Sequence, residues 1–297
     1  MIFSFPLNKE AWNNGLLTID WLKNHRSLIH DVYTTLDILE CAEMNGSKTT
    51  ANIKDILTLK KNNISVNIII NNVFNPPNMD LVLKRLTPLK DIIDSVTVPN
   101  HKWIQPFKDL GFHVKSTVIH VPTIDDISNG LYDSYDTIYI HDEIIHNHDK
   151  WLNVKGNRRL GCLVNLGYCK TDCPVKRDHY MYIDQGIDVD QFCPTFIEDG
   201  CETDEHILSR CIIPPFLEEY EYYLDTIDEY KFCGRDCDES FQDAFEIIDN
   251  IHHNNPVLLK RYSHLYALCE WRKHVRNCGG QCSKCKWCHA YAKRYIK

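Results

Sequence analysis

The sequence predicts an α/β protein, with a TIM-like barrel followed by a helical, cysteine-rich extension. Short apolar, β-branched segments alternate with segments of helical spacing from residue 27 to residue 166, a pattern that produces a parallel sheet with helices outside. At 297 residues with 43% apolar composition, the chain can bury one large core. No G-x-G-x-x-G turn or P-loop follows a strand, so the barrel is favoured over an open, doubly wound sheet.

The clearest strand is Ser65–Phe74, SVNIIINNVF, because its continuous β-branched run suits a strand covered on both faces. Further strands are expected at 27–33, 95–99, 113–121, 135–141, 158–166 and 228–234. Helices are expected at 48–61, 79–93, 101–110 and 124–131, and a polar helix is expected from the end of the strand 135–141 to about residue 152. Later helices are expected at 215–227, 240–252 and 256–276. Six or seven visible strands and one undetected strand would complete an eight-stranded barrel. The predicted barrel spans 1–239, including a cysteine-rich metal loop at 165–215, and the extension spans 240–297.

Composition narrows the classes of function. The formal net charge of −8 argues against general coating of DNA, which needs a dense basic surface. No apolar run approaches the roughly 20 residues of a membrane span, and the N-terminus lacks the features of a signal peptide. We therefore expect a cytoplasmic protein. In that reducing compartment, fourteen cysteines, thirteen of them after residue 160, indicate metal ligands rather than disulfides.

Five cysteines form the central candidate metal site. Cys169 and Cys173 make a C-x3-C pair after a buried strand, and three more follow at wider spacing, namely Cys193, Cys201 and Cys211. Structural zinc sites usually have two compact pairs, whereas iron–sulfur clusters tolerate scattered thiolates, so the spacing favours a cluster. Cys201 competes with Cys193 or Cys211 for a place. The alternative is that several of these cysteines are buried small hydrophobic residues.

Two stretches resemble a known family. NLGYCKTDCPVKRDHY, from Asn165 to Tyr180, and CIIPPFLEEYEYYLDTIDEYKFCGR, from Cys211 to Arg235, resemble motifs of collagenase-like U-32 peptidase-type barrels. Despite the peptidase name, the resemblance implies a 4Fe-4S cluster and oxygen-independent hydroxylation of RNA bases or ubiquinone precursors. The cluster ligands implied are Cys169, Cys173, Cys193 and Cys211, and the polar motif positions implied are Asn165, Arg177, His179, Lys231 and Arg235. The chain departs from the family at 214–217, Pro-Pro-Phe-Leu, where relatives often read Arg-Pro-Glu-Asp.

Three cationic side chains have a physical role beside the resemblance. Arg177, Lys231 and Arg235 would lie at the C-terminal rim of the barrel, where active sites are built. Guanidinium groups there would bind a carboxylate or phosphate bidentately, which indicates a small anionic substrate. Structured RNA is the alternative partner that the resemblance implies. The alternative is a set of solvated surface charges or ion pairs.

A second candidate metal site lies in the tail. Cys278, Cys282, Cys285 and Cys288 could hold a second cluster or a zinc ion, and the alternative is a helix carrying a cysteine stripe. Their C-x3-C-x2-C spacing is that of radical S-adenosylmethionine enzymes, although no barrel follows it here. His141, Asp142, Glu143, His146 and His148 follow a predicted strand and could bind a metal or move a proton, the alternative being an ordinary polar helix start.

The function that these features predict is an iron–sulfur oxidoreductase, with oxygen-independent hydroxylation of an RNA base or a small aromatic or anionic molecule as the specific reaction. No G-x-S-x-G or H-E-x-x-H motif is present, so we do not expect a protease. One alternative is a non-catalytic barrel, stabilised by zinc or a cluster, that binds a protein partner as a scaffold. The second alternative is a radical S-adenosylmethionine-type enzyme.

Overall fold

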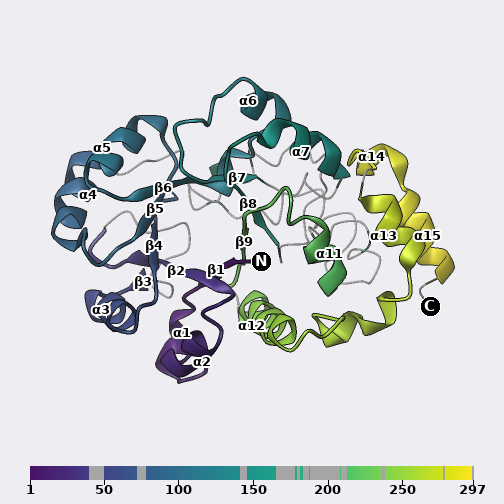
Figure 1. Ribbon diagram of the computed structural model, residues 1–297, viewed down its shortest axis with the longest axis horizontal. Coiled ribbons are helices and arrows are strands. Elements are labelled where there is room, and N and C mark those ends of the chain that lie inside the picture. Colours follow the sequence, from purple (N-terminus) through teal and green to yellow (C-terminus); the bar gives the residue numbers. More distant parts are fainter. Residues whose placement is uncertain are drawn as a thin grey trace.

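The computed structural model describes residues 1–39, 50–71, 78–140, 146–164, 213–235, 238–276 and 278–295, with a few single positions between 178 and 208. Its centre is a nearly closed barrel of parallel strands (Figure 1). The eight barrel strands are β1 (Phe3–Pro6), β2 (Ile29–Leu36), β4 (Val66–Ile69), β5 (Ser95–Val98), β6 (His113–Ser116), β7 (Ile138–Ile140), β8 (Leu160–Leu163) and β9 (Glu229–Lys231). This confirms the predicted TIM-like α/β barrel.

The strands follow one another around the barrel in chain order. β9 pairs with β1, and a single parallel bridge between Lys115 and Thr137 joins β6 to β7. A two-residue strand, β3 (Thr50–Ala51), pairs with the end of β2. Since all eight strands are parallel, their carboxyl ends meet at one rim, which is the rim that builds active sites in barrels of this kind.

Helices surround the strands (Figure 1). They are α1 (Lys9–Asn13), α2 (Ile19–Asn24), α3 (Ile53–Lys61), α4 (Met79–Leu86), α5 (Ile104–Asp109), α6 (Ile124–Ser128), α7 (His148–Lys155), α11 (Leu217–Tyr222) and α12 (Asp238–His252). Two of them start with a reciprocal capping box, Asn52 with Asp55 at α3 and Thr123 with Asp126 at α6. Such boxes satisfy amide groups that the first helical turn leaves unpaired.

The undetected strand of the sequence analysis is β1. Its four residues, FSFP, are all buried, and the proline stands at the strand's last position. So short a run has no readable periodicity, and a terminal proline lowers any strand prediction. The pairing of β1 with β2 and β9 nevertheless joins the early strands of the chain to its last barrel strand.

The helical extension is confirmed, and α12 covers the whole helix expected at 240–252, but the next predicted helix is divided. The single helix expected at 256–276 is instead a 3-10 helix, Lys260–Leu265, followed by α13 (Cys269–Val275). The tail forms α14 (Cys282–Cys285) and α15 (Trp287–Tyr295), which are separated by Lys286 in a left-handed conformation. Residues of the extension, namely Leu265, Trp271, Val275 and Ala292, pack with Leu208 and Phe216 of the preceding part of the chain, and these six residues form the small core of the extension.

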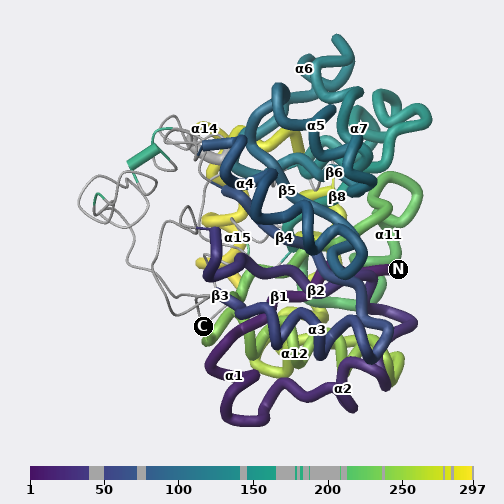
Figure 2. Tube along the Cα trace, turned by 90° about the vertical axis from the view of Figure 1, so that its left-hand side faces the viewer, coloured from purple at the N-terminus to yellow at the C-terminus, as the bar shows by residue number. Residues whose placement is uncertain are grey.

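The extension lies beyond α7 and α11 at one edge of the barrel (Figure 1). Figure 2 shows that β1 runs from the N-terminus towards the side on which α14 and α15 lie. Helix α12, by contrast, packs into the main core through residues such as Phe241 and Ile248. The division of the chain after residue 239 stays a prediction. No helix in the described part of the chain is long and apolar enough to cross a membrane.

Candidate active site in the barrel interior

The interior of the barrel is polar. Along each strand one set of residues packs outward against the helices in a single apolar cluster, as Phe3, Phe5 and Val32 do. The alternate set faces the barrel axis. It includes Ser4, Asp31, Tyr33, Asn67, Thr97, Lys115, Tyr139, Gly161, Glu229 and Lys231. Side chains of this kind must find partners among themselves, because unpaired buried polar groups are costly.

A network of ion pairs and hydrogen bonds fills the half of the barrel near the strand N-termini. The Lys115 ammonium lies 2.5 Å from Asp31 Oδ2 and 2.6 Å from Glu229 Oε1, and all three side chains are at most 2% exposed. Ser4 Oγ donates to Asp31 Oδ1 at 2.5 Å, and the Tyr139 hydroxyl donates to Glu229 Oε1. Three strands on different sides of the barrel are thereby joined through one cation.

The pKa values in this network follow from its geometry. Burial alone would raise the pKa of Glu229, but the Lys115 ammonium and the hydrogen bonds from Lys115 and Tyr139 outweigh it and lower this pKa to about 2. Burial alone would lower the pKa of Lys115, yet Asp31 and Glu229 raise it above the ordinary value. Burial, together with the neighbouring carboxylates, raises the pKa of Tyr139 well above 10. All three groups therefore hold fixed protonation states near neutral pH.

Gly161 makes room for this arrangement. A Cβ atom at Gly161 would lie 2.5 Å from two carbons of the Tyr139 ring, which is itself fully buried. A side chain there would push the ring away from Glu229. The need for glycine at this strand position therefore comes from the close approach of a neighbouring ring rather than from backbone conformation.

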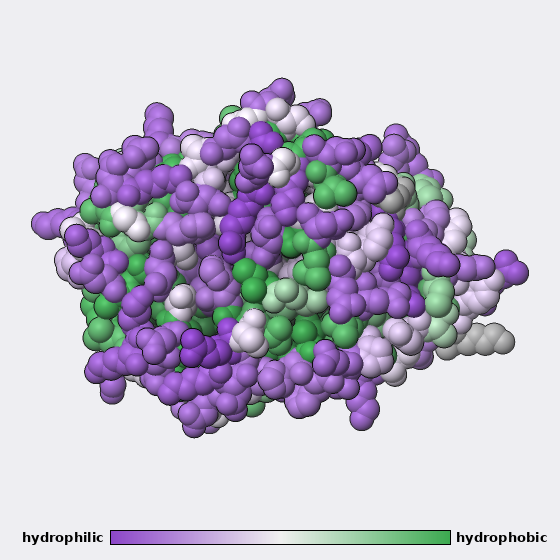
Figure 3. Space-filling view, in the orientation of Figure 1, coloured by the Kyte–Doolittle hydropathy of each residue, from purple (hydrophilic) through white to green (hydrophobic). Residues whose placement is uncertain are grey.

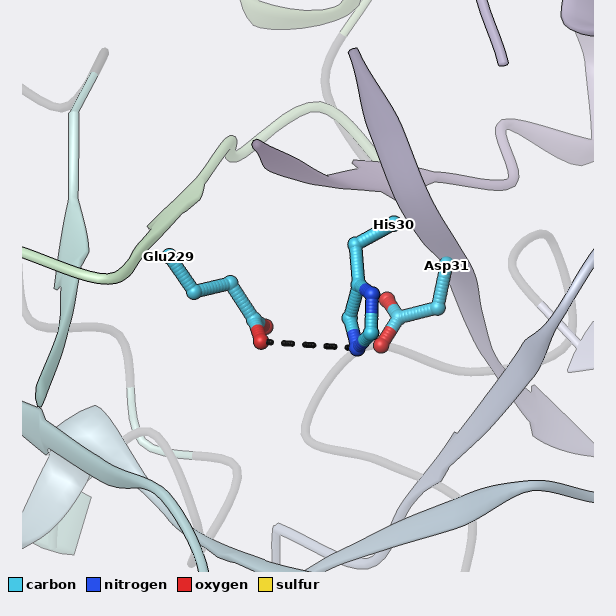
Figure 4. A group of neighbouring side chains, drawn as sticks. All are labelled: His30, Asp31 and Glu229. Atoms are coloured by element: carbon cyan, nitrogen blue, oxygen red, sulfur yellow. Dashed lines mark ion pairs between the residues drawn. The ribbon is translucent and has the colours of Figure 1, made fainter. Parts of the chain in front are cut away.

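His30, Asp31 and Glu229 have ligand atoms close enough to one another to hold a metal ion, and Figure 4 shows their side chains directed towards a common point. His30 Nε2 lies 4.0 Å from Glu229 Oε2. The ammonium of Lys115, however, already serves as the cation between the two carboxylates. A divalent ion there would have to displace a buried charge of the same sign, so we assign this group to the ion network.

The half of the barrel near the strand C-termini carries a different lysine. Lys231 ends β9 and is only 5% exposed, and its Nζ lies 4.7 Å from the ring centroid of Tyr33 and 4.9 Å from that of Tyr139. No ion pair joins it to a carboxylate among the residues that the structure describes. Burial, then the charges of Arg235 and Lys115, lower the pKa of Lys231 to about 8.

The loop after β9 brings Arg235 to the same place. Its guanidinium carbon lies 6.0 Å from the centroid of the Tyr33 ring, whose hydroxyl donates to the Phe232 carbonyl at 2.5 Å. Gly234, with φ of 128°, allows the turn, since a Cβ atom there would lie 2.6 Å from the backbone of Phe241. The side chain of Asn8 then donates to the Gly234 carbonyl at 3.1 Å, which ties the loops after β1 and β9 together.

The predicted site residues divide into two groups. Lys231 and Arg235 are brought together over one aromatic ring, as a shared substrate site would require. Of the other barrel residues named from the sequence, His146 and His148 are described and buried near the start of α7. The rest lie outside the described residues: His141, Asp142, Glu143, Asn165, Arg177, His179, Cys169, Cys173, Cys193, Cys201 and Cys211. In the tail, Cys278 and Cys285 are free cysteines, Cys282 begins α14, and Cys288 packs against the small core of the extension.

Sequence reasoning missed the ion network of Asp31, Lys115 and Glu229. A signal was present, because each of these charges stands within a short strand segment, namely HDVY, HVKS and EYK. A charged side chain at an inward position of a strand buried on both faces requires a buried partner. All three charges are buried, and the face of the molecule in Figure 3 presents mostly hydrophilic residues with apolar ones between them.

Comparison with known proteins gives one distant neighbour to report. No family model matches the chain. No curated protein matches it either. Among solved structures, the U32 peptidase Mk0906 is similar over 78% of this chain and 92% of its own, with a TM-score of 0.48 and 11% sequence identity. A similarity this distant transfers neither activity nor site residues to this chain.

Proposed function

We propose that the chain is an iron–sulfur oxidoreductase that binds an anionic substrate at the C-terminal rim of the barrel, with oxygen-independent hydroxylation as its reaction. The environment of Lys231 is the observation that supports binding of an anionic substrate. A buried ammonium with a lowered pKa and no described carboxylate partner stabilises a bound anion more than a surface lysine can.

The surroundings of Lys231 suit an aromatic or planar anion. Its ammonium contacts the faces of Tyr33 and Tyr139, and Arg235 adds a second positive charge beside the Tyr33 ring. A carboxylate or phosphate between the two cations would raise the pKa of Lys231 and relieve the repulsion between them. The rings exclude water from one side, which strengthens that interaction. A small carboxylate fits this enclosed position better than structured RNA does.

The proposal that the chain binds an iron–sulfur cluster is based on the sequence. Cys169 and Cys173 would supply two thiolates, Cys193 and Cys211 the other two, with Cys201 competing. Val164 is buried directly after β8, and the five residues from there to Cys169 can span at most about 18 Å. This length is sufficient for Cys169 to hold a cluster beside the C-terminal rim of the barrel. A cluster of this type would supply one-electron transfer when bound.

Metal and sulfide analysis of anaerobically purified protein tests the cluster. We expect iron and acid-labile sulfide with broad visible absorption, all lost in Cys169→Ala. The matched control is Cys162→Ala, because Cys162 stands seven residues earlier and packs into the outward-facing core. The Cys162→Ala protein should therefore retain its iron. Protein without iron and sulfide, or iron that survives Cys169→Ala, would refute this part.

Binding of benzoate and inorganic phosphate, followed by calorimetry, tests the substrate site separately. We expect the better probe to lose on the order of 100-fold in affinity in Lys231→Met, as truncation of a buried charge contact costs 2–5 kcal/mol. The control is Lys102→Met, which removes an exposed lysine. Equal binding by all three proteins would exclude Lys231 from the site.

A non-catalytic barrel stabilised by zinc or a cluster is the second candidate function, in which the chain acts as a scaffold for a protein partner. The position of Phe216 favours it. Where members of the resembling family often carry charges, this chain has a fully buried phenylalanine in the small core of the extension, contacting Tyr266 with ring centroids 5.4 Å apart. Colourless protein with zinc and no iron would support this alternative over the oxidoreductase.

A further inference from the structure

We propose that the Lys231 amine is a nucleophile that condenses with the carbonyl group of an oxo acid to form an imine, while Arg235 binds the carboxylate of the same molecule. An oxo acid here is an aldehyde or ketone that also carries a carboxylate. This role rests on the proposed anion site, because it names the class of anion that binds there. It does not depend on the iron–sulfur cluster.

The backbone of Lys231 is fixed at the rim where parallel barrels bind their substrates. Lys231 is the last residue of β9 and lies in register with Ser4 of β1 on one side and Leu163 of β8 on the other. Its carbonyl accepts from the Val164 amide at 3.0 Å, and the next residue, Phe232, donates to the Ser4 carbonyl at 3.1 Å. A reactive side chain on a strand that is paired on both sides is placed more precisely than one on a loop.

Two aromatic rings flank the amine. Its Nζ lies 4.7 Å from the ring centroid of Tyr33 and 4.9 Å from that of Tyr139, and Lys231 is 5% exposed. No carboxylate lies within ion-pair distance of this amine among the residues that the structure describes. A desolvated position without a counter-ion favours the neutral amine, which is the form whose lone pair attacks a carbonyl carbon.

Positive neighbours favour the neutral amine further. Burial, and then the charges of Arg235 and Lys115, lower the pKa of Lys231 from 10.5 to about 8. At pH 7 this change raises the neutral fraction from about 0.03% to about 10%, a gain on the order of 300-fold. Desolvation and an adjacent cation are the two conditions that make a lysine nucleophilic enough for covalent catalysis.

Lys115 provides the contrast within the same barrel. It is also buried, but Asp31 and Glu229 pair with its ammonium and raise its pKa above the ordinary value. The Lys115 amine therefore keeps its proton near neutral pH and has no lone pair with which to attack a carbonyl. Of these two lysines, Lys231 is the one that can act as a nucleophile.

Arg235 supplies the second contact that an oxo acid needs. Its guanidinium carbon lies 6.0 Å from the centroid of the Tyr33 ring, the same ring over which the Lys231 amine lies. A guanidinium group binds a carboxylate through two parallel hydrogen bonds. Because a short oxo acid has its carbonyl only a few bonds from its carboxylate, one molecule can contact both cationic side chains across a single ring. A ketone without a carboxylate lacks the second contact.

The reaction balances without a further reactant. The lone pair of Lys231 Nζ forms a bond to the carbonyl carbon, and the carbonyl oxygen takes up a proton to give a carbinolamine. The C–O bond then breaks, the two amine hydrogens leave with the oxygen as water, and a C=N bond forms. No electron passes to or from another molecule. The protonated imine is a cation, which the faces of Tyr33 and Tyr139 stabilise as they stabilise the ammonium.

Reductive trapping with pyruvate tests the nucleophile. We expect the full chain, incubated with pyruvate and sodium cyanoborohydride near neutral pH, to gain one reduced adduct per chain, which peptide mass spectrometry assigns to Lys231. Lys231→Met should gain no adduct. The matched control Lys102→Met removes an exposed lysine and should be modified as the wild type is. A wild type without the adduct, or an equal adduct in Lys231→Met, would overturn the proposal.

Acetone tests the requirement for a carboxylate. It carries the ketone of pyruvate without the carboxylate, so the wild type should trap it more slowly by on the order of 10-fold or more, the value of hydrogen bonds to a charged group. Arg235→Met should lose this preference and still form its adduct on Lys231. The ratio of the two rates is unaffected by any change in the reactivity of the amine itself. Equal rates for both ketones in the wild type would overturn the assignment to an oxo acid.

The imine and the anion site can fail separately. A wild type that binds benzoate or phosphate through Lys231 but forms no adduct would refute the imine and retain the anion site. Absence of the adduct, together with binding that Lys231→Met leaves unchanged, would refute both.

Discussion

The two inward-facing lysines of the barrel should respond in opposite ways to the same substitution. Lys231→Met removes a buried charge that has no described counter-ion, whereas Lys115→Met removes the cation shared by Asp31 and Glu229. Both positions are buried and both changes keep an apolar stem of similar length. The pair therefore separates the effect of charge compensation from the effect of side-chain volume.

The magnitude for Lys231 follows from its pKa. The interval from the ordinary 10.5 to about 8 corresponds to about 3 kcal/mol, at roughly 1.36 kcal/mol for each pH unit. Burying the charged form costs this much near neutral pH, so Lys231→Met should raise the free energy of unfolding by up to about 3 kcal/mol. Lys115→Met should lower it by about 3–5 kcal/mol, because two buried carboxylates lose their cation.

The dependence on pH gives the sharper test. A lysine with a lowered pKa binds fewer protons folded than unfolded between pH 8 and 10.5, so the stability of the wild type rises across that interval. The advantage of Lys231→Met should therefore be complete below about pH 8 and should disappear by about pH 10.5. Urea unfolding near pH 7 and near pH 10 measures both values. Destabilisation by Lys231→Met near neutral pH, or an advantage that is independent of pH, would refute the reasoning.

Three further substitutions test the packing and charge of the same interior. Gly161→Ala should lower the free energy of unfolding by about 1–3 kcal/mol through the clash with the Tyr139 ring, and unchanged urea unfolding would contradict the close approach. Glu229→Gln should be less stable than wild type above pH 4.5, and the difference should shrink as pH falls towards 2. The reason is that a carboxyl group with a lowered pKa loses its stabilising effect in that interval. A difference in the free energy of unfolding that stays constant across an acid titration would argue against the ion pair. Gly234→Ala should weaken binding of the anion probe along with stability, because it displaces the loop that carries Arg235, and calorimetry showing wild-type binding would separate that loop from the site.

The barrel could be predicted from the sequence because the patterns that indicate its strands and helices are local in the chain. Continuous β-branched runs such as the one that became β4 are typical of strands covered on both faces, and their alternation with helical segments restricts the topology to a parallel sheet. Strand ends were less accurate, and the segment expected at 65–74 is a strand only at Val66–Ile69 among the described residues. The break between the 3-10 helix and α13 depends on packing within the extension, which local periodicity does not encode.

The candidate site could be predicted only in part, because its decisive contacts are not local. The motif near β9 was enough to name Lys231 and Arg235, yet nothing near them in the chain indicates that Tyr33 and Tyr139 lie beside the ammonium.

Charge compensation across the barrel explains why, of the two buried lysines in the part of the barrel that the structure describes, Lys231 rather than Lys115 is suited to bind a ligand. Lys115 meets partners 84 and 114 residues away, and these contacts neutralise it in the half of the barrel near the strand N-termini. Its positive charge is one of the causes that lower the pKa of Lys231, on the opposite half. The ion network thus does more than hold strands together: it commits the buried carboxylates to one lysine and leaves the other, at the rim where barrels bind substrates, to be neutralised by an incoming anion.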